Sequence, residues 1–553
     1  MHLGIDLDNT VISYDEVFLF GALELKLVPI GWEGSRLQVR DYVRHQKDGD
    51  IAWQRLQGKV YGKWLHLAKL FPGVYRFLWR CKYRNIVVDI VSHKTEYGHL
   101  DDEKISLRKS ALDFLIEHEV LSMSSESLIN KIDFFSRKEE KLEHISKKQF
   151  DWFIDDLPEI VEHDEFPRKT KTFGFDPTGA SGFRFTNTVK SWAEIENYVL
   201  GKWLEDEVKD FASRVSDRAV IDCKWQSGRG NSGIKTKNIG GRRNAGISRV
   251  EMIDGAINAL KIYPVDYHHD RLFSEYEGLR LLRQRNIKQV PRPIASDRKM
   301  QAAMYEWIEG EPVENLRKND LDQALDLLAN IHSLRGFPEF STFPGASAAI
   351  FSGHQLEKQI YERLWRLRDQ SVKSSKLKAF LTGELEPMVK EILKWSRMHW
   401  PKPKNYDEAI SLKERTLSPS DFGFHNALRV DNSQIMFFDF EYFGWDDPAK
   451  LIGDFLLHPG MQLSKELRSL WIDGAKDIFG KIVIERARVM WPMLGLCWCI
   501  ILLNEYRKDI WARRTEIVGL DPKNKNIMLD RQLKLSKKYL QRIKETYKDF
   551  QFE

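Results

Sequence analysis

Two aspartates stand near the start of the chain, two residues apart, in the segment LGIDLDNTV. Asp6 and Asp8 follow a short apolar run that predicts a strand, and residues two apart on a strand share one face. Ligands and chemistry gather at the carboxyl ends of the strands in open parallel sheets. One carboxylate there can attack phosphorus to give an aspartyl-phosphate, while the second protonates the leaving oxygen. The pair alone is weak evidence, because acidic pairs are common on protein surfaces.

Later segments strengthen this interpretation, because further apolar runs also end in polar side chains. NIVVDIVSHK ends with Ser92, whose hydroxyl suits a phosphoryl oxygen. FDWFIDDLPEI ends with Asp155 and Asp156, oxygen ligands suited to Mg²⁺. Between these runs, SRKEEKLEHI offers Lys138 and Lys141 as cations that could neutralise a phosphoryl group.

This order of motifs resembles the haloacid dehalogenase (HAD) phosphatase superfamily over about residues 1–180, and it matches all four motifs of that superfamily. The resemblance implies a nucleophile, a general acid/base, a turn-stabilising residue, a phosphate-binding hydroxyl and a cation, which are Asp6, Asp8, Thr10, Ser92 and Lys141 in that order, with Lys138 competing for the last role. It also implies that Asp155 and Asp156 hold Mg²⁺ together with Asp6 and the main chain of Asp8.

The stretch Trp32 to Leu70 is helical in pattern and rich in Arg, Trp and Gln. In the superfamily an insertion here forms a small helical cap, which we expect at about residues 13–75. Such a cap would exclude water from the leaving group and select the substrate. Arg40, Arg44, Gln54 and Gln57 are candidate substrate contacts, and a merely solvated helix face is an equal alternative for each.

A second group of chemical residues lies in LSPSDFGFHNALRVDNSQIMFFDFEYFGWDDP. Asp421 and Asn426 are five apart in a predicted loop, and a strand then delivers Asp439. A phosphotransferase needs one carboxylate to accept the alcohol proton, and an amide with a second carboxylate to hold Mg²⁺ on the nucleotide. The aromatic residues that follow could form a box for a quaternary ammonium, but core packing is the commoner role at such spacing.

Upstream segments agree with this interpretation. Lys261 lies in a predicted buried strand, where a charged group needs a partner, and Glu275 on the next helix could pair with it. The glycines of IGGRRNAGISRV, Gly240 and Gly241, could cover phosphates with backbone N–H groups. The segment near Glu306 to Ile308 could hydrogen-bond adenine.

This second assembly resembles the aminoglycoside phosphotransferase and choline kinase family over about residues 220–510. The resemblance implies that Asp421 is the catalytic base, that Asn426 and Asp439 bind Mg²⁺, and that Lys261 and Glu275 form the nucleotide-side ion pair. The family usually has a His two residues before the catalytic Asp, and this chain has Pro419 there. An inactive, nucleotide-sensing pseudokinase is therefore the alternative.

The fold class expected from these motifs is α/β. Residues 1–204 would form a Rossmann-like HAD domain with the cap, and residues 205–553 a bilobal kinase-like α+β domain with lobes at about 215–312 and 313–553. Length and composition agree, because 553 residues with 42% hydrophobic and 30% charged residues suit several globular domains. The apolar run Val489 to Leu503 is short for a membrane span, and the basic tail after Asp521 predicts a packed C-terminal helix.

These features together predict a cytoplasmic bifunctional enzyme that uses Mg²⁺ and ATP. One site would act on a phosphorylated metabolite and the other on a small hydroxylated substrate, and a role in surface polysaccharide precursor synthesis is one hypothesis. The net charge of +5 argues against nucleic acid as a partner, and so does the lack of a P-loop. No leader peptide is predicted, the four cysteines are expected to be buried thiols, and the oligomeric state stays open.

Overall fold

The structure is a computed structural model that describes residues 1–100, 103–122, 124–179, 182–226, 246–264, 269–403, 405–431, 433–461, 463–508, 510–511 and 525–548. The chain divides into two compact units. The first contains residues 1–208 and 297–301, and the second contains residues 209–296 and 302–553. Each unit has its own sheet and is described by itself.

In the described part of the first unit, six parallel strands form a sheet in the order β5-β4-β1-β6-β7-β8. The strands are β1 (His2–Ile5), β4 (Val87–His93), β5 (Lys131–Phe135), β6 (Trp152–Asp155), β7 (Lys171–Phe175) and β8 (Thr188–Val189). The first strand lies inside the sheet, and the chain adds strands on one side of it and then on the other. This is the strand order of a doubly wound sheet, so the predicted parallel sheet is present.

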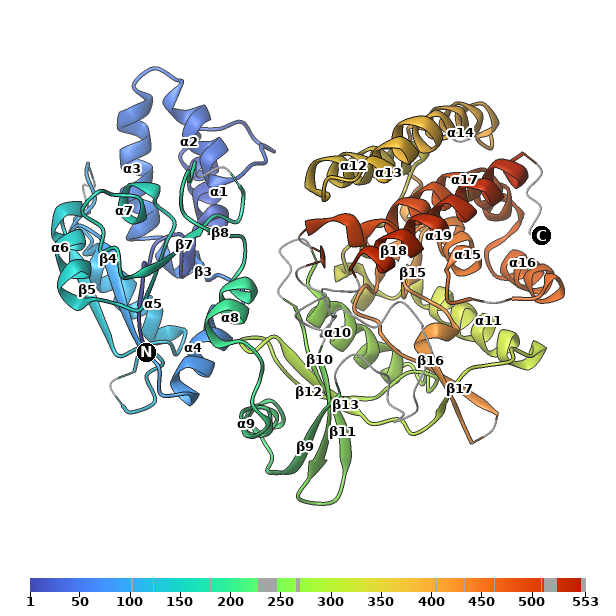
Figure 1. Cartoon of the computed structure of the whole chain (residues 1–553), viewed down its shortest axis with the longest axis horizontal. Helices are drawn as coiled ribbons and strands as arrows, with labels where there is room; N and C mark the ends of the chain where they lie inside the picture. The colour runs from blue at the N-terminus through green and yellow to red at the C-terminus, as the bar shows by residue number, and fades with distance from the viewer. Residues whose placement is uncertain are drawn as a thin grey trace. The chain divides into compact units, whose positions relative to one another are not determined.

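Helices cover both faces of this sheet (Figure 1). They are α4 (Val74–Tyr83), α5 (Leu107–Glu117), α6 (Lys138–Lys148), α7 (Pro158–Val161) and α8 (Trp192–Leu200). A further helix, α9 (Glu205–Ser216), spans the boundary between the two units in the chain. On one face, Phe153 of β6 packs in a cluster with Leu142 of α6. On the other face, Phe175 of β7 lies against Trp192 of α8. Burial on both faces explains why the strands read as continuous apolar runs.

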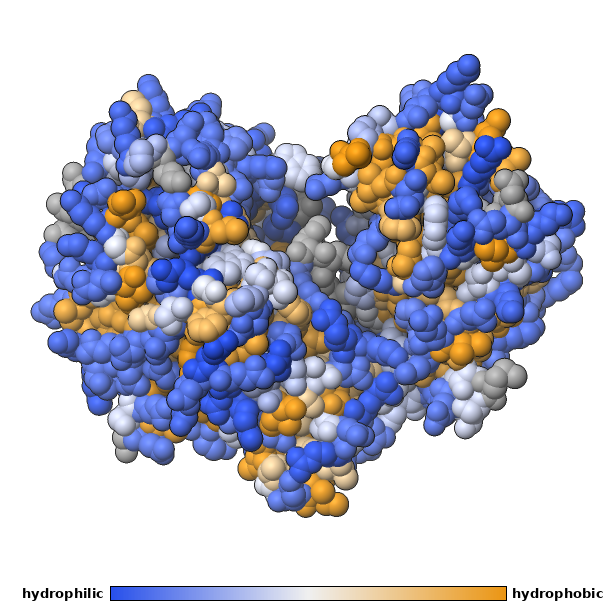
Figure 2. All heavy atoms as spheres, turned by 180° about the vertical axis from the view of Figure 1, so that it is seen from behind, coloured by the Kyte–Doolittle hydropathy of each residue, from blue (hydrophilic) through white to orange (hydrophobic). Residues whose placement is uncertain are grey.

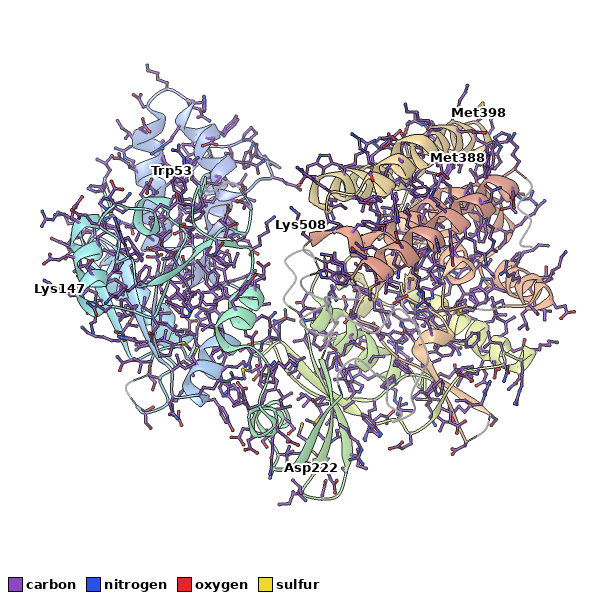
Figure 3. All side chains as sticks on the ribbon, viewed as in Figure 1. Trp53, Lys147, Asp222, Met388, Met398 and Lys508 are labelled. Carbon is purple, nitrogen blue, oxygen red and sulfur yellow. The ribbon has the colours of Figure 1, made fainter. Side chains whose placement is uncertain are left out.

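The predicted cap is an insertion between the first two long strands. It contains α1 (Asp15–Glu24), α2 (Arg36–Arg44), α3 (Gly49–Tyr61) and the short η1 (Leu65–Leu67). The two-residue strands β2 (Ile12–Ser13) and β3 (Lys69–Leu70) pair at its base. Trp53, labelled in Figure 3, stacks on Phe18 with ring centroids 4.9 Å apart and so joins α3 to α1. The helical stretch expected from Trp32 onward is therefore two helices with a break between Arg44 and Gly49.

The described strands of the second unit begin with a five-stranded sheet in the order β12-β13-β11-β10-β9. They are β9 (Val220–Gln226), β10 (Gly246–Met252), β11 (Ile257–Ile262), β12 (Pro293–Asp297) and β13 (Ala302–Glu306), and α10 (Arg271–Gln284) follows β11 in the chain. Strand β11 is central, with β10 and β13 as antiparallel neighbours. This placement buries the lysine that β11 carries.

The rest of the second unit is mostly helical. Its described helices are α11 (Lys318–Ser333), η2 (Leu334–Gly336), η3 (Pro338–Thr342), α12 (Gly353–Gln370), α13 (Ser375–Phe380), the π-turn η4 (Leu381–Leu385), α14 (Glu386–His399), η5 (Leu412–Glu414), η6 (Phe424–Asn426), α15 (Pro448–Leu457), α16 (Lys465–Phe479), α17 (Lys481–Ile501), η7 (Asn504–Tyr506) and α19 (Lys525–Thr546). Short strands interrupt them at β14 (Glu311–Pro312), β15 (Thr416–Ser418), β16 (Ala427–Val430), β17 (Gln434–Phe437) and β18 (Gly444–Asp446).

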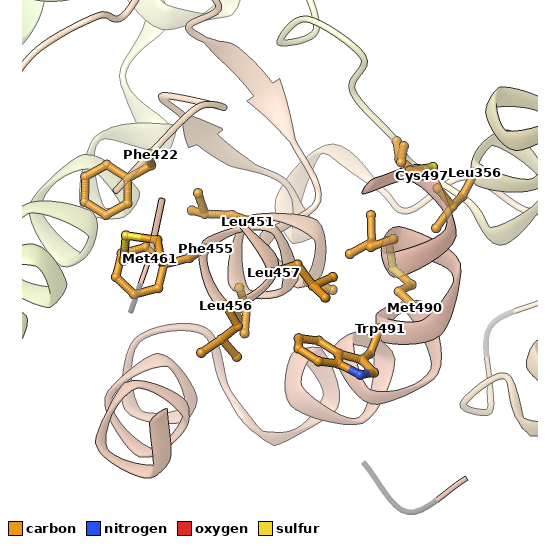
Figure 4. Close-up of a cluster of buried hydrophobic side chains, with 14 of the residues drawn as sticks. Leu356, Phe422, Leu451, Phe455, Leu456, Leu457, Met461, Met490, Trp491 and Cys497 are labelled. Carbon is orange, nitrogen blue, oxygen red and sulfur yellow. The ribbon is translucent and has the colours of Figure 1, made fainter. Parts of the chain in front are cut away.

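The core of this helical part surrounds α15 and α17. Figure 4 shows Leu451 and Phe455 of α15 lying between Phe422 on one side and Met490 and Trp491 of α17 on the other. The tail helix α19 packs on α17. The residues predicted for its apolar face are buried, namely Leu529, Leu533, Leu540 and Ile543 within the helix and Tyr547 just after it. The four cysteines are buried free thiols, as predicted.

Residues 481–506 correct one expectation. This stretch is long and apolar enough to cross a membrane by length and composition, although the run from Val489 alone is short. Within the unit, the most apolar 18-residue part of this stretch is 72% buried, as expected for the core helix of a globular domain.

The surface visible in Figure 2 is mostly hydrophilic, with apolar residues in small groups.

Candidate active sites

Three carboxylates meet at the carboxyl edge of the parallel sheet in the first unit. Asp6 follows β1, Asp155 ends β6 and Asp156 follows it, and all three are buried. One carboxylate oxygen from each lies within 4.8 Å of the others. Because β1 and β6 are adjacent and parallel, their ends coincide. The pairing therefore creates the cluster that the sequence predicts.

Lys141 of α6 neutralises part of this charge. Its Nζ lies 2.5 Å from Asp6 Oδ1 and 2.7 Å from Asp155 Oδ2, and its side chain is fully buried. Lys138 instead pairs with Glu159 on the surface, 2.8 Å away. The structure thus brings Lys141, and not its competitor, to the carboxylates.

One lysine does not balance three carboxylates. Burial raises the pKa of Asp6 above its ordinary range, with Asp155 and Asp8 adding to the rise and Lys141 opposing it. Burial also raises the pKa of Asp156, and the neighbouring Asp6 and Asp155 add to the effect. A divalent cation bound by these oxygens would relieve that repulsion, and an all-oxygen donor set fits Mg²⁺. The residues present therefore fit the predicted metal.

Asp8 stands beside the cluster with a different set of partners. The hydroxyl of Tyr14 donates to Asp8 Oδ1 over 2.6 Å, and Lys94 Nζ lies 2.9 Å from Asp8 Oδ2. The buried hydroxyls of Thr10 and Ser92 have no hydrogen-bond partner among the described residues. Unpartnered buried hydroxyls call for an explanation, and an incoming phosphoryl oxygen would supply the missing acceptor. Sequence reasoning missed Lys94, although it lies two residues after the predicted Ser92.

The helical insertion predicted as a cap contributes Arg36 and Tyr61, which the sequence did not single out. Arg36 of α2 lies 3.8 Å from Asp156, and burial raises the pKa of Tyr61 to about 12. Arg40 and Arg44 form ion pairs with Asp41 and Asp50 on the cap itself. Neither arginine is brought to the carboxylates by any described ion pair.

Lys261 forms the centre of the second site. On the central strand β11 it lies 2.6 Å from Glu275 Oε2, 2.6 Å from Asp439 Oδ1 and 3.3 Å from Glu441 Oε2. The pairing with Glu275 is the one suggested by the sequence. The contact with Asp439 also places the predicted metal ligand beside the nucleotide-side lysine.

Glu441 and Arg271 are members of this cluster that the sequence reasoning did not assign. Arg271 Nη1 lies 2.9 Å from Glu441 Oε1. Arg271 and Glu275 are four residues apart on α10, so they project from one face of the helix. Oxygens of Glu275, Asp439 and Glu441 lie within 4.8 Å of one another. Glu441 lies only two residues after the predicted Asp439, and this closeness along the chain was the available signal.

Backbone geometry at Asp439 is unusual. Its φ of 68° is in the left-handed region, which costs a non-glycine residue roughly 1–2 kcal/mol. Burial raises the pKa of its carboxyl above the ordinary value, Lys261 opposes the rise, and Glu441 adds to it. A strained, half-buried carboxylate in a cluster that holds more carboxylates than cations fits a metal ligand. We take this as a fit of the donor set to Mg²⁺.

Asp421 lies in the loop between β15 and β16, and the same loop carries the predicted Asn426. Asn426 Nδ2 donates to the backbone oxygen of Asp421 over 3.0 Å, and an amide that donates through Nδ2 keeps Oδ1 for a metal. His425 Nε2 lies 3.1 Å from Asp421 Oδ1. Burial alone would raise the pKa of Asp421, but His425, His458 and Asn426 hold it well below its usual range. Asp421 therefore stays ionised, as a proton acceptor must.

The predicted adenine segment joins the two parts of the second unit. The backbone amides of Glu306 and Trp307 donate to the carbonyl oxygens of Arg292 and Ile257, so these two amides already have partners. Ile308 packs with Leu428 and Met436 in an apolar cluster separate from the main core. Gly240 and Gly241 lie outside the described residues.

The aromatic residues after Asp439 belong to the core. Phe443 is fully buried, and Trp445 Nε1 donates to the backbone oxygen of Phe340 over 3.1 Å. Tyr442 packs beside Arg271, whose guanidinium lies 4.9 Å from the ring centroid. These contacts favour the packing role over a quaternary ammonium box.

Comparison with known proteins bears on this second site. Residues 253–481 match the phosphotransferase enzyme family. The match includes Lys261, Glu275, Asp421, Asn426 and Asp439, and it begins after residue 208, where the main segment of the first unit ends. The second unit is therefore phosphotransferase-like.

Solved structures similar to this chain are of the same kind. A spectinomycin phosphotransferase in complex with ADP and spectinomycin is 12% identical, with 60% of this chain and 98% of that chain covered and a TM-score of 0.39. A choline kinase from Cryptosporidium parvum is 14% identical, with 57% and 93% covered and a TM-score of 0.35. A choline kinase from Streptococcus pneumoniae is 12% identical, with 61% and 98% covered and a TM-score of 0.38. All three TM-scores are below 0.5. No curated protein sequence matches the chain.

Proposed function

We propose that the second unit transfers the γ-phosphoryl group of ATP to a hydroxyl of a small molecule. The observation that carries this proposal is the junction of Lys261 with both Glu275 and Asp439, 2.6 Å from each, within the segment that matches a phosphotransferase family. The ionised Asp421 completes the set. A nucleotide-sensing pseudokinase would need no such base.

Each residue has a defined task in this transfer. Asp421 accepts the proton of the acceptor hydroxyl. The oxygen of that hydroxyl bonds to the γ-phosphorus, and the bond from the γ-phosphorus to the β-phosphate oxygen breaks. Lys261 holds the α- and β-phosphates, and Glu275 orients it. Asn426 and Asp439 would hold Mg²⁺, which neutralises charge on the phosphates when bound. Ile308 and its apolar neighbours receive the adenine.

We further propose that the first unit is a phosphatase of the HAD type. The observation that favours it is the buried Asp6–Lys141–Asp155 arrangement beside two unpartnered hydroxyls. Asp6 attacks phosphorus, and the ester bond to the leaving oxygen breaks as Asp8 supplies that oxygen with a proton. Water then hydrolyses the aspartyl-phosphate, with Asp8 taking its proton. Mg²⁺ held by Asp6, Asp155 and Asp156 would neutralise the phosphoryl charge.

The two activities are proposed to act on different compounds, because opposing reactions at one phosphate would only consume ATP. The test is mass spectrometry of a panel of sugars, polyols, amino alcohols and their phosphates, incubated with Mg-ATP. Wild type is compared with Asp6→Asn and Asp421→Asn, and Asp473→Asn is an exposed control on α16. Asp421→Asn alone should abolish gain of phosphate, and Asp6→Asn alone should abolish its loss.

Other outcomes separate the two proposals. If ATP binds but no compound gains phosphate, the second unit is a pseudokinase. If loss of phosphate persists in the Asp6→Asn protein, the HAD-type mechanism is wrong.

A further inference from the structure

Two buried histidines stack beside Asp421, and they come from separate elements. His425 belongs to η6 in the catalytic loop, and His458 directly follows α15. Their ring centroids are 3.6 Å apart with an interplanar angle of 14°. Both Nε2 atoms face the same carboxylate oxygen, Asp421 Oδ1, at 3.1 Å from His425 and 3.8 Å from His458.

A backbone contact fixes the tautomer of His458. The N–H of Gly460 donates to His458 Nδ1 over 3.1 Å, so Nδ1 carries the lone pair. A neutral imidazole has one ring proton, which then lies on Nε2, the atom that faces Asp421. Burial, together with the neighbouring His425, lowers the pKa of His458 to about 3, so the ring is neutral. His458 is therefore oriented as a hydrogen-bond donor towards Asp421.

The segment from His458 to Met461 also contacts the catalytic loop at Phe424 and His425. Met461 Sδ accepts a hydrogen bond from the backbone N–H of Phe424 over 3.3 Å. A Cβ at Gly460 would lie 3.0 Å from His425 Cβ and 3.1 Å from the His458 ring, so a larger residue would separate this segment from the loop. The chain after α15 is thus fitted to the loop that carries the base.

We propose that His458 is a positioning residue for Asp421: through Nε2–H it holds the carboxylate in the orientation that receives the acceptor proton. This inference rests on the phosphotransferase function proposed above. Pro419 has neither a side-chain donor nor a backbone N–H, so it cannot supply such a contact. The 3.8 Å separation is long for a hydrogen bond, and contacts of this kind tighten when substrates bind.

The first test is the rate of ADP release from Mg-ATP, with water as the acceptor, by the full-length protein. His458→Asn keeps an amide near the position of Nδ1 but cannot reach Asp421, whereas His458→Gln places an N–H near the position of Nε2. His458→Asn should lower kcat about 10- to 100-fold with KM for ATP unchanged, and His458→Gln should recover most of the loss. His354→Asn, an exposed histidine of α12, is the matched control.

Asp421→Asn in the same assay distinguishes failure of the positioning role of His458 from failure of the phosphotransferase proposal. If Asp421→Asn is slow while both His458 variants match wild type, the positioning role is wrong and the phosphotransferase proposal stands. If Asp421→Asn matches wild type, the assignment of the base is wrong and the inference fails with it.

A second measurement does not depend on activity. The ¹⁵N shifts of the histidine ring nitrogens should show His458 as a neutral imidazole protonated at Nε2, with His458→Gln assigning the signals. Protonation at Nδ1 instead would overturn the proposal, because Nε2 would then have no proton to donate.

Discussion

Both candidate sites place a buried lysine between two carboxylates, but they are assembled from different kinds of element. Lys141 reaches from a helix to Asp6 and Asp155, which stand at the ends of neighbouring parallel strands. Lys261 stands on a central antiparallel strand, and its partners come from helix α10 and from the loop after β17. The first cluster is brought together by the ends of two paired strands. The second cluster is brought together by side-chain contacts between segments that are distant in the sequence.

The two sites also differ in how many other groups support the carboxylates. Glu275 accepts hydrogen bonds from Tyr263 and from the backbone of Phe440, and Glu441 is paired with Arg271. Asp6 relies on Lys141 for the hydrogen bond to its carboxylate among the described contacts. The second cluster should therefore tolerate loss of its lysine better than the first. The predictions that follow test this difference.

The largest effect is expected for Lys141→Met. Removing the cation leaves Asp6 and Asp155 as buried charges without their partner, which costs about 3–5 kcal/mol of unfolding free energy. Urea unfolding followed by a probe in the first unit should show the loss, and added Mg²⁺ should restore part of it. Lys138→Met, at an exposed position on the same helix, should change stability by less than about 0.5 kcal/mol. Equal effects of the two variants would contradict the assignment of Lys141.

Lys261→Met should destabilise the second unit by a smaller amount, about 1–3 kcal/mol, because Tyr263 and Arg271 still satisfy the remaining carboxylates. It should also weaken ATP binding measured by calorimetry. A loss of stability greater than that of Lys141→Met would contradict the claim that the second cluster tolerates loss of its lysine better than the first.

Acid should affect the two units to different extents. In the first unit, burial alone would raise the pKa of Glu196, but Arg76 and Arg80 hold it below its ordinary value. A lowered carboxyl pKa gives stability that is present above about pH 4.3, the unfolded value, and is lost as pH falls further. In the second unit, burial lowers the pKa of His332 to about 4, so stability there should start to fall below about pH 6.5.

Thermal unfolding between pH 7 and 4 tests this difference. The second unit should lose more stability between pH 6.5 and 5, because the pKa of His332 is lowered by a large amount, although burial also lowers the pKa of His93 and His144 in the first unit. His332→Asn should remove that part of the pH dependence of the second unit. If the first unit is the more sensitive between pH 6.5 and 5, the assigned causes are wrong.

Two tightly packed glycines, one in each unit, give a further comparison. A Cβ on Gly4 of β1 would lie 2.5 Å from the Phe153 ring, and a Cβ on Gly278 of α10 would lie 2.9 Å from the Phe443 ring. Gly4→Ala should cost about 1–3 kcal/mol by overpacking. Gly278→Ala should cost less, because alanine favours the helix by about 1 kcal/mol. Denaturant midpoints of the two variants measure the difference.

Much of the first unit could be predicted from sequence because its signals are local. Three apolar runs predicted strands that are present, and the polar residues after them lie at one sheet edge because parallel strands end together. The short strand β5 was missed, since KIDFF alternates with polar residues and resembles no buried run. Lys94 and Arg36 were missed because neither their spacing nor their type distinguishes them from surface cations.

The second unit shows what sequence spacing leaves open. The residues Asp421, Asn426 and Asp439 were found from their spacing along the chain, and Lys261 with Glu275 from the rule that a buried lysine needs a partner. His458 is 37 residues after Asp421 in the printed sequence, in a segment with no recognisable motif. Its place beside the base follows from the packing of α15 against the catalytic loop, which no local pattern encodes.

The sequence by itself determined which residues could do chemistry, because residue type and periodicity specify strands, helix faces and the polar residues that end them. It also specified the buried thiols and the packed tail helix, since burial follows hydrophobic spacing. The tertiary structure alone decided that Lys141 and not Lys138 meets Asp6, that Glu441 joins Lys261, and that two histidines face Asp421. Those choices depend on how distant segments approach each other, and only packing of the whole unit fixes that approach.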